Sequence, residues 1–179
     1  MKGKTSIVLA VALLLMVSCS KQKKHYSDIE NMEKKLYSEN FTYDDKGKAE
    51  AMELVTKYLS YAEMYPDDTL APEFTFRAAD LTMNFGDASK AINLYNKIIY
   101  TYPGYRRNPE CLFLIAFIYD NHLQNYGKAR QVYEEFLSRY PDHDFADDAS
   151  MSIRNLGKSP EELVNEFENK GQNEETAGK

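Results

Sequence analysis

The sequence lacks tryptophan and is poor in residues that bend the backbone, which narrows the classes of protein it fits. Of its 179 residues, 8 are glycine and 6 are proline, so a turn-rich all-β protein is disfavoured and collagen-like or low-complexity classes are excluded. Basic side chains are outnumbered, because 22 Lys and Arg stand against 28 Asp and Glu, a formal net charge of −6. Since phosphate binding requires a basic face, nucleic acid is not an expected partner. The 43% of apolar residues, with 14 Tyr and 9 Phe, suffice for a globular domain with a hydrophobic core.

Two cysteines are too few for a disulfide framework, and the first follows an apolar run near the N-terminus. Lys2 and Lys4 precede Ile7–Val17, a run shorter than the about 20 residues that span a bilayer and typical of a secretory signal. The run ends in Met16-Val17-Ser18-Cys19, which resembles the lipobox of bacterial lipoproteins. That resemblance implies a signal peptide over residues 1–18 and acylation of Cys19. The alternative is an ordinary cleaved signal followed by a chance cysteine.

Cleavage before Cys19 would leave 20 basic and 28 acidic side chains, a formal charge of −8. Residues 19–27 are then predicted to be a tether, whose eight residues after the cysteine extend to at most about 28 Å. Its lysines, at positions 21, 23 and 24, would each add about 1 kcal/mol of attraction to anionic headgroups. Ser20 after the cysteine resembles the sorting pattern for the outer membrane of Gram-negative bacteria, and the basic tether favours the periplasmic face.

The second cysteine, Cys111, lies in the apolar run 111–115 and is interpreted as a small buried hydrophobe. With Cys19 acylated, it would have no intramolecular disulfide partner. A nucleophilic role is the alternative, and it would need a base and an electropositive setting that the sequence does not display.

A repeat of 37 to 38 residues runs through the chain. Its clearest marker is the dipeptide Tyr-Pro, which occurs at Tyr65-Pro66, Tyr102-Pro103 and Tyr140-Pro141 with spacings of 37 and 38 residues. Eight residues before each proline stands a tyrosine, and twelve before it a leucine or alanine: Tyr58, Tyr95 and Tyr133, and Leu54, Ala91 and Ala129. In the third copy the apolar residues follow the spacing of an amphipathic helix that the proline ends.

A second helix precedes two of these segments and begins at Pro72-Glu73 and at Pro109-Glu110. Proline suits the first position of a helix, and an acid beside it suits the positive end of the helix dipole. Aligning the two prolines places Phe76 on Phe113 and Ala79 on Ala116. The repeated unit is therefore predicted to be a helix hairpin, and the first helix of the first copy is placed loosely over residues 27–39.

These small, aromatic and proline positions resemble the tetratricopeptide (TPR) repeat. The resemblance implies an all-α solenoid of about three TPR-like helix hairpins over residues 28–157, closed by C-terminal capping helices. One of these is expected after Asp142 and Asp144, which are good cap residues, and another over residues 158–170, with Ser159 as its cap. Residues 171–179 are expected to be a disordered tail. An unrelated helical bundle is the alternative fold, and a Ca²⁺ site is the alternative role of the aspartates around position 145.

In a TPR array the first helices of the hairpins form a concave binding face. The resemblance places ten residues on it: Glu73, Phe76, Asp80, Met83, Asn84, Glu110, Phe113, Phe117, Asp120 and Asn121. Apolar side chains ringed by acids would suit an extended or helical peptide with basic residues. The alternative is that Phe76 and Phe113 belong to the core, or that Phe117 packs against a neighbouring hairpin.

No catalytic constellation is visible, because His25, His122 and His143 lack metal-ligand spacing and no glycine-rich phosphate loop exists. We therefore expect neither an enzyme nor a metal, cofactor or small-molecule substrate. A lipobox followed by repeats over residues 49–156 resembles the TPR lipoproteins of outer-membrane β-barrel assembly, which implies a scaffold for envelope proteins. Residues 126–149 also resemble the TPR part of the Tol–Pal-associated periplasmic coordinator. An accessory subunit of an envelope enzyme is a third interpretation.

Overall fold

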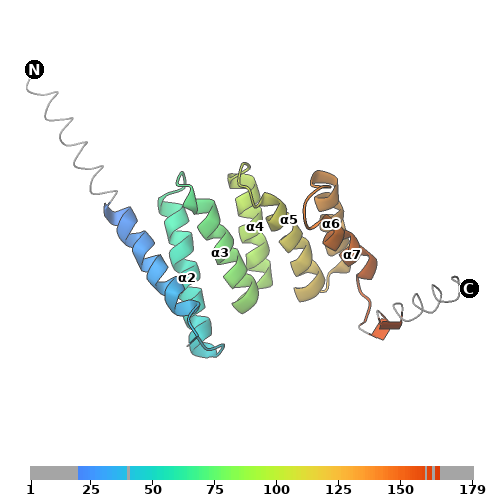
Figure 1. Cartoon of the computed structure of the whole chain (residues 1–179), viewed down its shortest axis with the longest axis horizontal. Coiled ribbons are helices and arrows are strands. Elements are labelled where there is room, and N and C mark those ends of the chain that lie inside the picture. The colour runs from blue at the N-terminus through green and yellow to red at the C-terminus, as the bar shows by residue number, and fades with distance from the viewer. Residues whose placement is uncertain (1–19, 40, 160, 163, 166–179) are drawn as a thin grey trace, which may run out of the picture. The chain divides into compact units, whose positions relative to one another are not determined.

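The computed structural model describes residues 20–39, 41–159, 161–162 and 164–165, and every regular element in these ranges is a helix. In chain order they are a helix over residues 20–36, α2 (Asp45–Met64), α3 (Leu70–Phe85), α4 (Ala88–Thr101), α5 (Asn108–Phe117), the π-helical turn η1 (Ile118–His122), α6 (Tyr126–Arg139) and α7 (Ala146–Asn155), as drawn in Figure 1. The all-α class of helix hairpins is confirmed. The predictions for the signal peptide, for Cys19 and for residues 171–179 lie outside the described residues.

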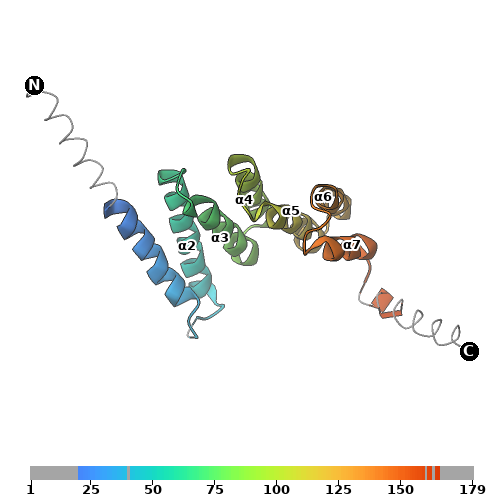
Figure 2. The ribbon, with the colours of Figure 1, turned by 45° about the horizontal axis from the view of Figure 1, so that its top comes forward.

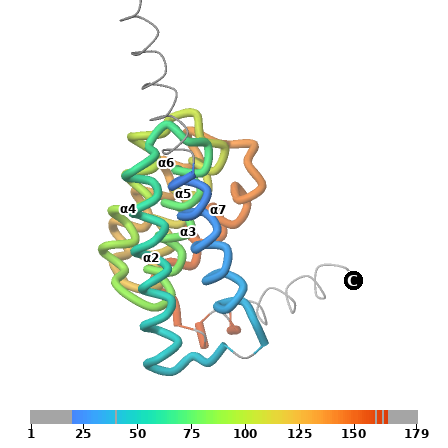
Figure 3. The backbone as a smooth tube through the Cα atoms, turned by 90° about the vertical axis from the view of Figure 1, so that its left-hand side faces the viewer, coloured from blue at the N-terminus to red at the C-terminus, as the bar shows by residue number. Residues whose placement is uncertain are grey.

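The chain divides into two compact units, Met1–Tyr102 and Pro103–Lys179, each described by itself. In the first unit the helix over residues 20–36 returns through a short link into α2 (Figure 3), α2 packs on α3, and α3 on α4. The core between the hairpins is aromatic: the Phe74 ring lies 5.2 Å from that of Tyr58 and 4.8 Å from that of Tyr61. All three side chains are at most 2% exposed, so they contribute both burial and ring–ring attraction, the latter about 0.5–1.5 kcal/mol per pair.

The links between these helices follow from local chemistry. Asp44 caps α2 by accepting a 2.8 Å hydrogen bond from the backbone N–H of Gly47. A Cβ at Gly47 would lie 1.8 Å from the carbonyl oxygen of Thr42, so this close approach requires glycine. Asp87 caps α4 through the N–H groups of Ser89 and Lys90, which fixes the turn between α3 and α4.

The predicted tether over residues 19–27 is wrong, because the chain is already helical at residue 20. The amide of Gln22 donates to the Tyr61 hydroxyl at 3.0 Å and to Asp68 Oδ2 at 2.5 Å. The ring of His25 lies 5.5 Å from that of Tyr61. These contacts to α2 and to the link after it hold the segment as the first two turns of the first helix.

The second unit contains one hairpin, α5–η1 with α6, and α7 packed on α6 (Figure 2). The ring of Phe113 contacts those of Tyr133, Phe136 and Phe145, with centroids 4.8 to 5.7 Å apart. Cys111 is completely buried on α5, as the interpretation as a small hydrophobe predicts.

Two terminal predictions have opposite outcomes. Asp142 and Asp144 do not cap α7, because its N-cap is Phe145, which makes no side-chain capping bond. Ser159 does cap the helical segment that follows. Its hydroxyl accepts from the N–H of Glu162 at 3.2 Å, and the Glu162 carboxylate accepts from the N–H of Ser159 at 2.7 Å, a reciprocal capping box.

The small residues that align in the repeat are buried at the hairpin contacts. Ala79, Ala91, Ala116 and Ala129 are each 0% exposed. A side chain no larger than methyl lets two helices approach closely, and neighbouring aromatic residues fill the remaining space. The alignment of small residues is therefore confirmed in both units.

Candidate functional site

Two of the predicted groove residues on α3 are engaged inside the first unit. Phe76 is only 1% exposed, and its ring meets that of Tyr95 edge-on at 5.5 Å. Asp80 accepts a hydrogen bond from the Tyr95 hydroxyl at 2.5 Å. The assignment of Phe76 to an open groove is wrong, because its side chain belongs to the contact between α3 and α4. Met83 is half-buried, and Asn84 is exposed and donates to the carbonyl oxygen of Asp80 at 2.9 Å.

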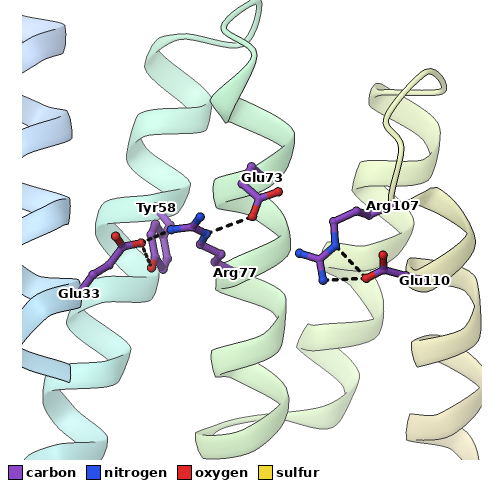
Figure 4. Close-up of polar contacts among 6 residues, drawn as sticks. All are labelled: Glu33, Tyr58, Glu73, Arg77, Arg107 and Glu110. Atoms are coloured by element: carbon purple, nitrogen blue, oxygen red, sulfur yellow. Dashed lines mark hydrogen bonds and ion pairs between the residues drawn. The ribbon is translucent and has the colours of Figure 1, made fainter. Parts of the chain in front are cut away.

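Glu73 belongs to an ionic network on the same unit (Figure 4). The guanidinium of Arg77 lies between two carboxylates, 2.5 Å from Glu33 Oε1 and 3.2 Å from Glu73 Oε1. Glu33 also accepts from the Tyr58 hydroxyl at 2.5 Å. Burial and the hydrogen bond to Glu33 raise the pKa of Tyr58 well above its ordinary value. Burial lowers the pKa of Arg77, but the hydrogen bonds to the two carboxylates outweigh this effect, so the pKa of Arg77 is raised.

In the second unit, three predicted groove residues line one cleft of about 440 Å³, formed by the end of α5, η1, the start of α6 and α7. They are Phe117, Asp120 and Asn121. The predicted groove did not include the other lining residues, of which only Asp148 had been considered for binding, as one of the aspartates around position 145. These residues are Gln124, Tyr126, Asp148, Met151, Ser152, Asn155, Gly157 and Lys158. They come from α6, α7 and the links beside them, whereas the resemblance pointed only to the first helix of each hairpin.

The other two predicted residues of α5 do not line this cleft. Phe113 packs into the aromatic core of the unit, so the core interpretation holds for it. Its side chain is half-buried rather than fully buried. Glu110 accepts from Arg107 at 2.7 Å, as Figure 4 also shows.

One wall of the cleft is an interrupted helix. After Phe117 the chain widens into η1, where the N–H of Leu123 bonds to the carbonyl of Ile118 at 3.0 Å, an i to i+5 contact. Gln124 follows with a positive φ of 50°. π-Helical turns are rare and frequently occur at functional sites.

The extra residue of the third repeat lies close to this turn, in the link that follows it, because the last helical residues Phe85 and His122 are themselves 37 residues apart. Phe76 aligns with Phe113 at an offset of 37, whereas the caps Asp87 and Asn125 align at an offset of 38. The extra residue therefore enters between these positions, in the link after η1.

The opposite wall is held by a close contact between the first residue of α6 and the link after α7. Gly157 has φ +76°, and a Cβ at this position would lie 3.3 Å from the Tyr126 ring. Glycine accepts both the positive φ and the close approach. Across α6 and α7, Arg130 donates to the carbonyl of Ile153 at 3.3 Å, so the ring of Tyr126 is held in place beside the cleft.

The polar groups around the cleft are incompletely paired. Burial raises the pKa of Asp120 above its ordinary value. Neither Asp120 nor Asp148 forms an ion pair with any described residue. The hydroxyl of Tyr133 is buried and has no hydrogen-bond partner in the described part of the chain. Burial raises the pKa of Tyr133 to about 12, and the charge of Asp120 raises it further, whereas the neighbouring Ser152 hydroxyl lowers it.

Neither a metal site nor a membrane span is found in the part of the chain that the structure describes. No group of three or more His, Cys, Asp or Glu side chains there is placed to hold an ion. No helix there is both long and apolar enough to cross a bilayer.

Comparison with known families identifies the hairpin that carries the cleft. Residues 110–143 match the tetratricopeptide repeat family, and this stretch runs from the first turn of α5 past the end of α6. The chain contains a tetratricopeptide repeat. Together with the buried small residues, this match confirms that its helix hairpins are TPR-like. No curated protein matches the chain. TPR domains generally bind protein partners, so the matched hairpin indicates a protein-interaction scaffold.

Proposed function

We propose that this chain is a lipid-anchored TPR adaptor, without catalytic activity, that holds protein partners at the periplasmic face of the outer membrane during assembly of envelope proteins. The observation that carries the adaptor role is the cleft in the TPR hairpin, where Phe117, Asp120 and Asn121 meet. The anchor rests on Met16-Val17-Ser18-Cys19. An acyl group there, with basic residues beside it, would supply the two signals that stable membrane attachment requires.

The absence of a tether sharpens this proposal. Helix is present from residue 20, so the acyl chain on Cys19 and the folded first unit would be adjacent in sequence. Lys21, Lys23 and Lys24 are all exposed on that first helix, where they would face anionic headgroups. The first unit would therefore lie at the bilayer surface rather than several nanometres from it.

The anchor is tested with Cys19→Ala and membrane fractionation. The variant should lose labelling by a radioactive or clickable fatty acid and leave the membrane fraction after a high-salt wash. Its helix content should be unchanged, because every described helix lies after residue 19. A variant that stays with the outer membrane after the wash would refute lipid anchoring.

The pathway is tested by crosslinking in native membranes followed by purification of the intact protein. Enrichment of barrel-assembly components supports our proposal. Enrichment of Tol–Pal components would instead support a coordination adaptor, an alternative favoured by the likeness of residues 126–149 to that system's periplasmic coordinator. Stoichiometric capture of one envelope hydrolase would make the chain an accessory subunit of an enzyme.

A further inference from the structure

The cleft of the second unit contains a carboxylate whose position the fold does not explain. Asp120 lies in η1, the last turn of the continuous helix that begins with α5. A negative charge near the carboxyl end of a helix is disfavoured by the helix dipole. Asp120 is also half-buried and has no cationic partner among the described residues. Three separate effects therefore make this side chain unfavourable in the unoccupied protein.

The second carboxylate of the cleft differs in this respect. Asp148 lies in the first turn of α7, where the dipole favours an acid, and its side chain is exposed. It needs no ligand to be stable there. Together the two carboxylates outnumber Lys158, the one basic side chain among the lining residues, so the cleft carries an excess of negative charge.

Aromatic and polar groups complete the arrangement. The rings of Phe117 and Tyr126 line the cleft with the carboxylates, and Tyr126 is 41% exposed. A planar or ammonium cation is attracted to an aromatic face and to a carboxylate at once. The Tyr133 hydroxyl does not line the cleft, but it is buried without a hydrogen-bond partner, and its pKa is influenced by Asp120 and Ser152, both of which do line it. In the first unit the equivalent tyrosines each donate to a carboxylate, Tyr58 to Glu33 and Tyr95 to Asp80.

The difference between the units lies in one aligned position. Phe117 stands where Asp80 stands one repeat earlier, so the third hairpin has an aromatic ring in place of the acceptor. Its acid is found three residues later, at Asp120 in the π turn. In one hairpin the carboxylate of Asp80 accepts the hydrogen bond of Tyr95, whereas in the next hairpin the carboxylate of Asp120 lines the cleft.

We propose that this cleft takes the cationic side chain of an arginine or lysine in an extended segment of the partner protein, with Asp120 as the principal counter-ion, Asp148 as the second, and Phe117 and Tyr126 as the aromatic walls. The inference rests on the proposed function, because it assumes that the occupant is a protein segment. It adds the chemistry by which that segment is recognised.

The test uses the chain from Ser20 to Lys179, which keeps every described residue, and two short Ala/Ser peptides with one central residue, arginine or its neutral isostere citrulline. In a ¹⁵N-HSQC titration, the arginine peptide should shift signals around residues 117–126 and 148–158. The citrulline peptide should bind at least about tenfold more weakly, the loss expected for a charge-assisted contact. Asp120→Asn should weaken binding of the arginine peptide by a similar factor. Asp147→Asn, which changes an exposed neighbour of Asp148 outside the cleft, should not.

Equal binding of the two peptides, shifts elsewhere on the protein, no binding of either, or full binding by Asp120→Asn would each overturn the proposal. Thermal melts of both variants accompany the titration, and Asp120→Asn should be at least as stable as the parent, so weaker binding cannot be attributed to unfolding. Partner capture by crosslinking, measured separately, distinguishes failure of the adaptor role from failure of the cationic-occupant proposal. Capture without peptide discrimination would leave the adaptor role standing and refute only the cationic occupant.

Discussion

The hydroxyl of Tyr95 donates a 2.5 Å hydrogen bond to Oδ1 of Asp80. This bond ties the second helix of a hairpin to the first, and it consumes a carboxylate that the TPR resemblance assigned to a binding groove. Its counterpart in the next hairpin, Tyr133, has no such acceptor among the described residues. At equivalent positions of two successive hairpins, Tyr95 therefore makes a hydrogen bond between helices and Tyr133 does not.

Tyr95→Phe should lower the free energy of unfolding by about 1.5–3 kcal/mol, the range for a hydrogen bond to a charged acceptor. Tyr133→Phe should change it little or raise it, because the phenyl ring fills the same space and removes a buried group that has no partner. Urea denaturation followed by circular dichroism gives both values. Equal losses in the two variants would contradict the assignment of these hydrogen bonds.

Ala116→Leu and Ala129→Leu should each destabilise the second unit by about 1–3 kcal/mol, because both alanines are 0% exposed where helices touch and extra methylenes overpack such a contact. Glu134→Leu, on the exposed face of α6, is the matched control and should be nearly neutral. Thermal melts that do not separate the buried sites from the exposed one would refute the repeat alignment.

Phe117→Ala and Phe113→Ala should have opposite effects although they lie four residues apart on one helix. Phe113 contacts three rings of the core, so its truncation should cost about 3–5 kcal/mol of stability. Phe117 lines the cleft and should lose partner capture instead, by about 2 kcal/mol or more if it is an interface anchor, with little change in melting temperature. Melting temperature and pull-down yield measured on both variants decide. A large stability loss for Phe117→Ala would place that ring in the core.

Asp120→Asn should raise stability at neutral pH, and the gain should disappear in acid. Burial raises the pKa of Asp120 in the folded protein, so the folded state holds its proton more tightly than the unfolded state does. Stability from this group is complete below the unfolded pKa of 3.8. It falls as the pH rises through the folded value, and the penalty is complete above that value. Urea denaturation of parent and variant at pH 7 and near pH 3.5 checks the sign, and a variant less stable than the parent at pH 7 would contradict it.

The features that the sequence predicted well are local ones. Ser159 and Glu162 are three residues apart, and their capping box needs nothing beyond those residues. The buried alanines follow from the repeat, because every copy must solve the same packing problem at the same position.

The failures involve contacts between distant residues or the direction of a side chain. The helix at residues 20–26 is held by hydrogen bonds from Gln22 to Tyr61 and Asp68. A local sequence pattern cannot predict contacts between residues so far apart in the chain. Phe76 lies on α3, the helix that was expected to contribute to the groove. A helix contacts more than one neighbour, however, and the ring of Phe76 packs against that of Tyr95 on α4 instead of facing the groove. The cleft combines residues of α5, η1, α6 and α7, so the pattern of a single helix could not predict all of its lining residues.

The π turn at residues 118–122 suggests a way to remove the cleft by changing the length of the chain rather than its side chains. The third repeat is one residue longer than the second, and the extra residue lies between Phe113 and Asn125, the stretch that also contributes Phe117, Asp120, Asn121 and Gln124 to the cleft. Removing one codon within the turn would return the helix to ordinary α geometry and shift the residues after it by about 100° around the axis. We expect such a deletion to displace the cleft residues that follow the turn, and so to weaken partner capture without substituting any side chain that lines the cleft.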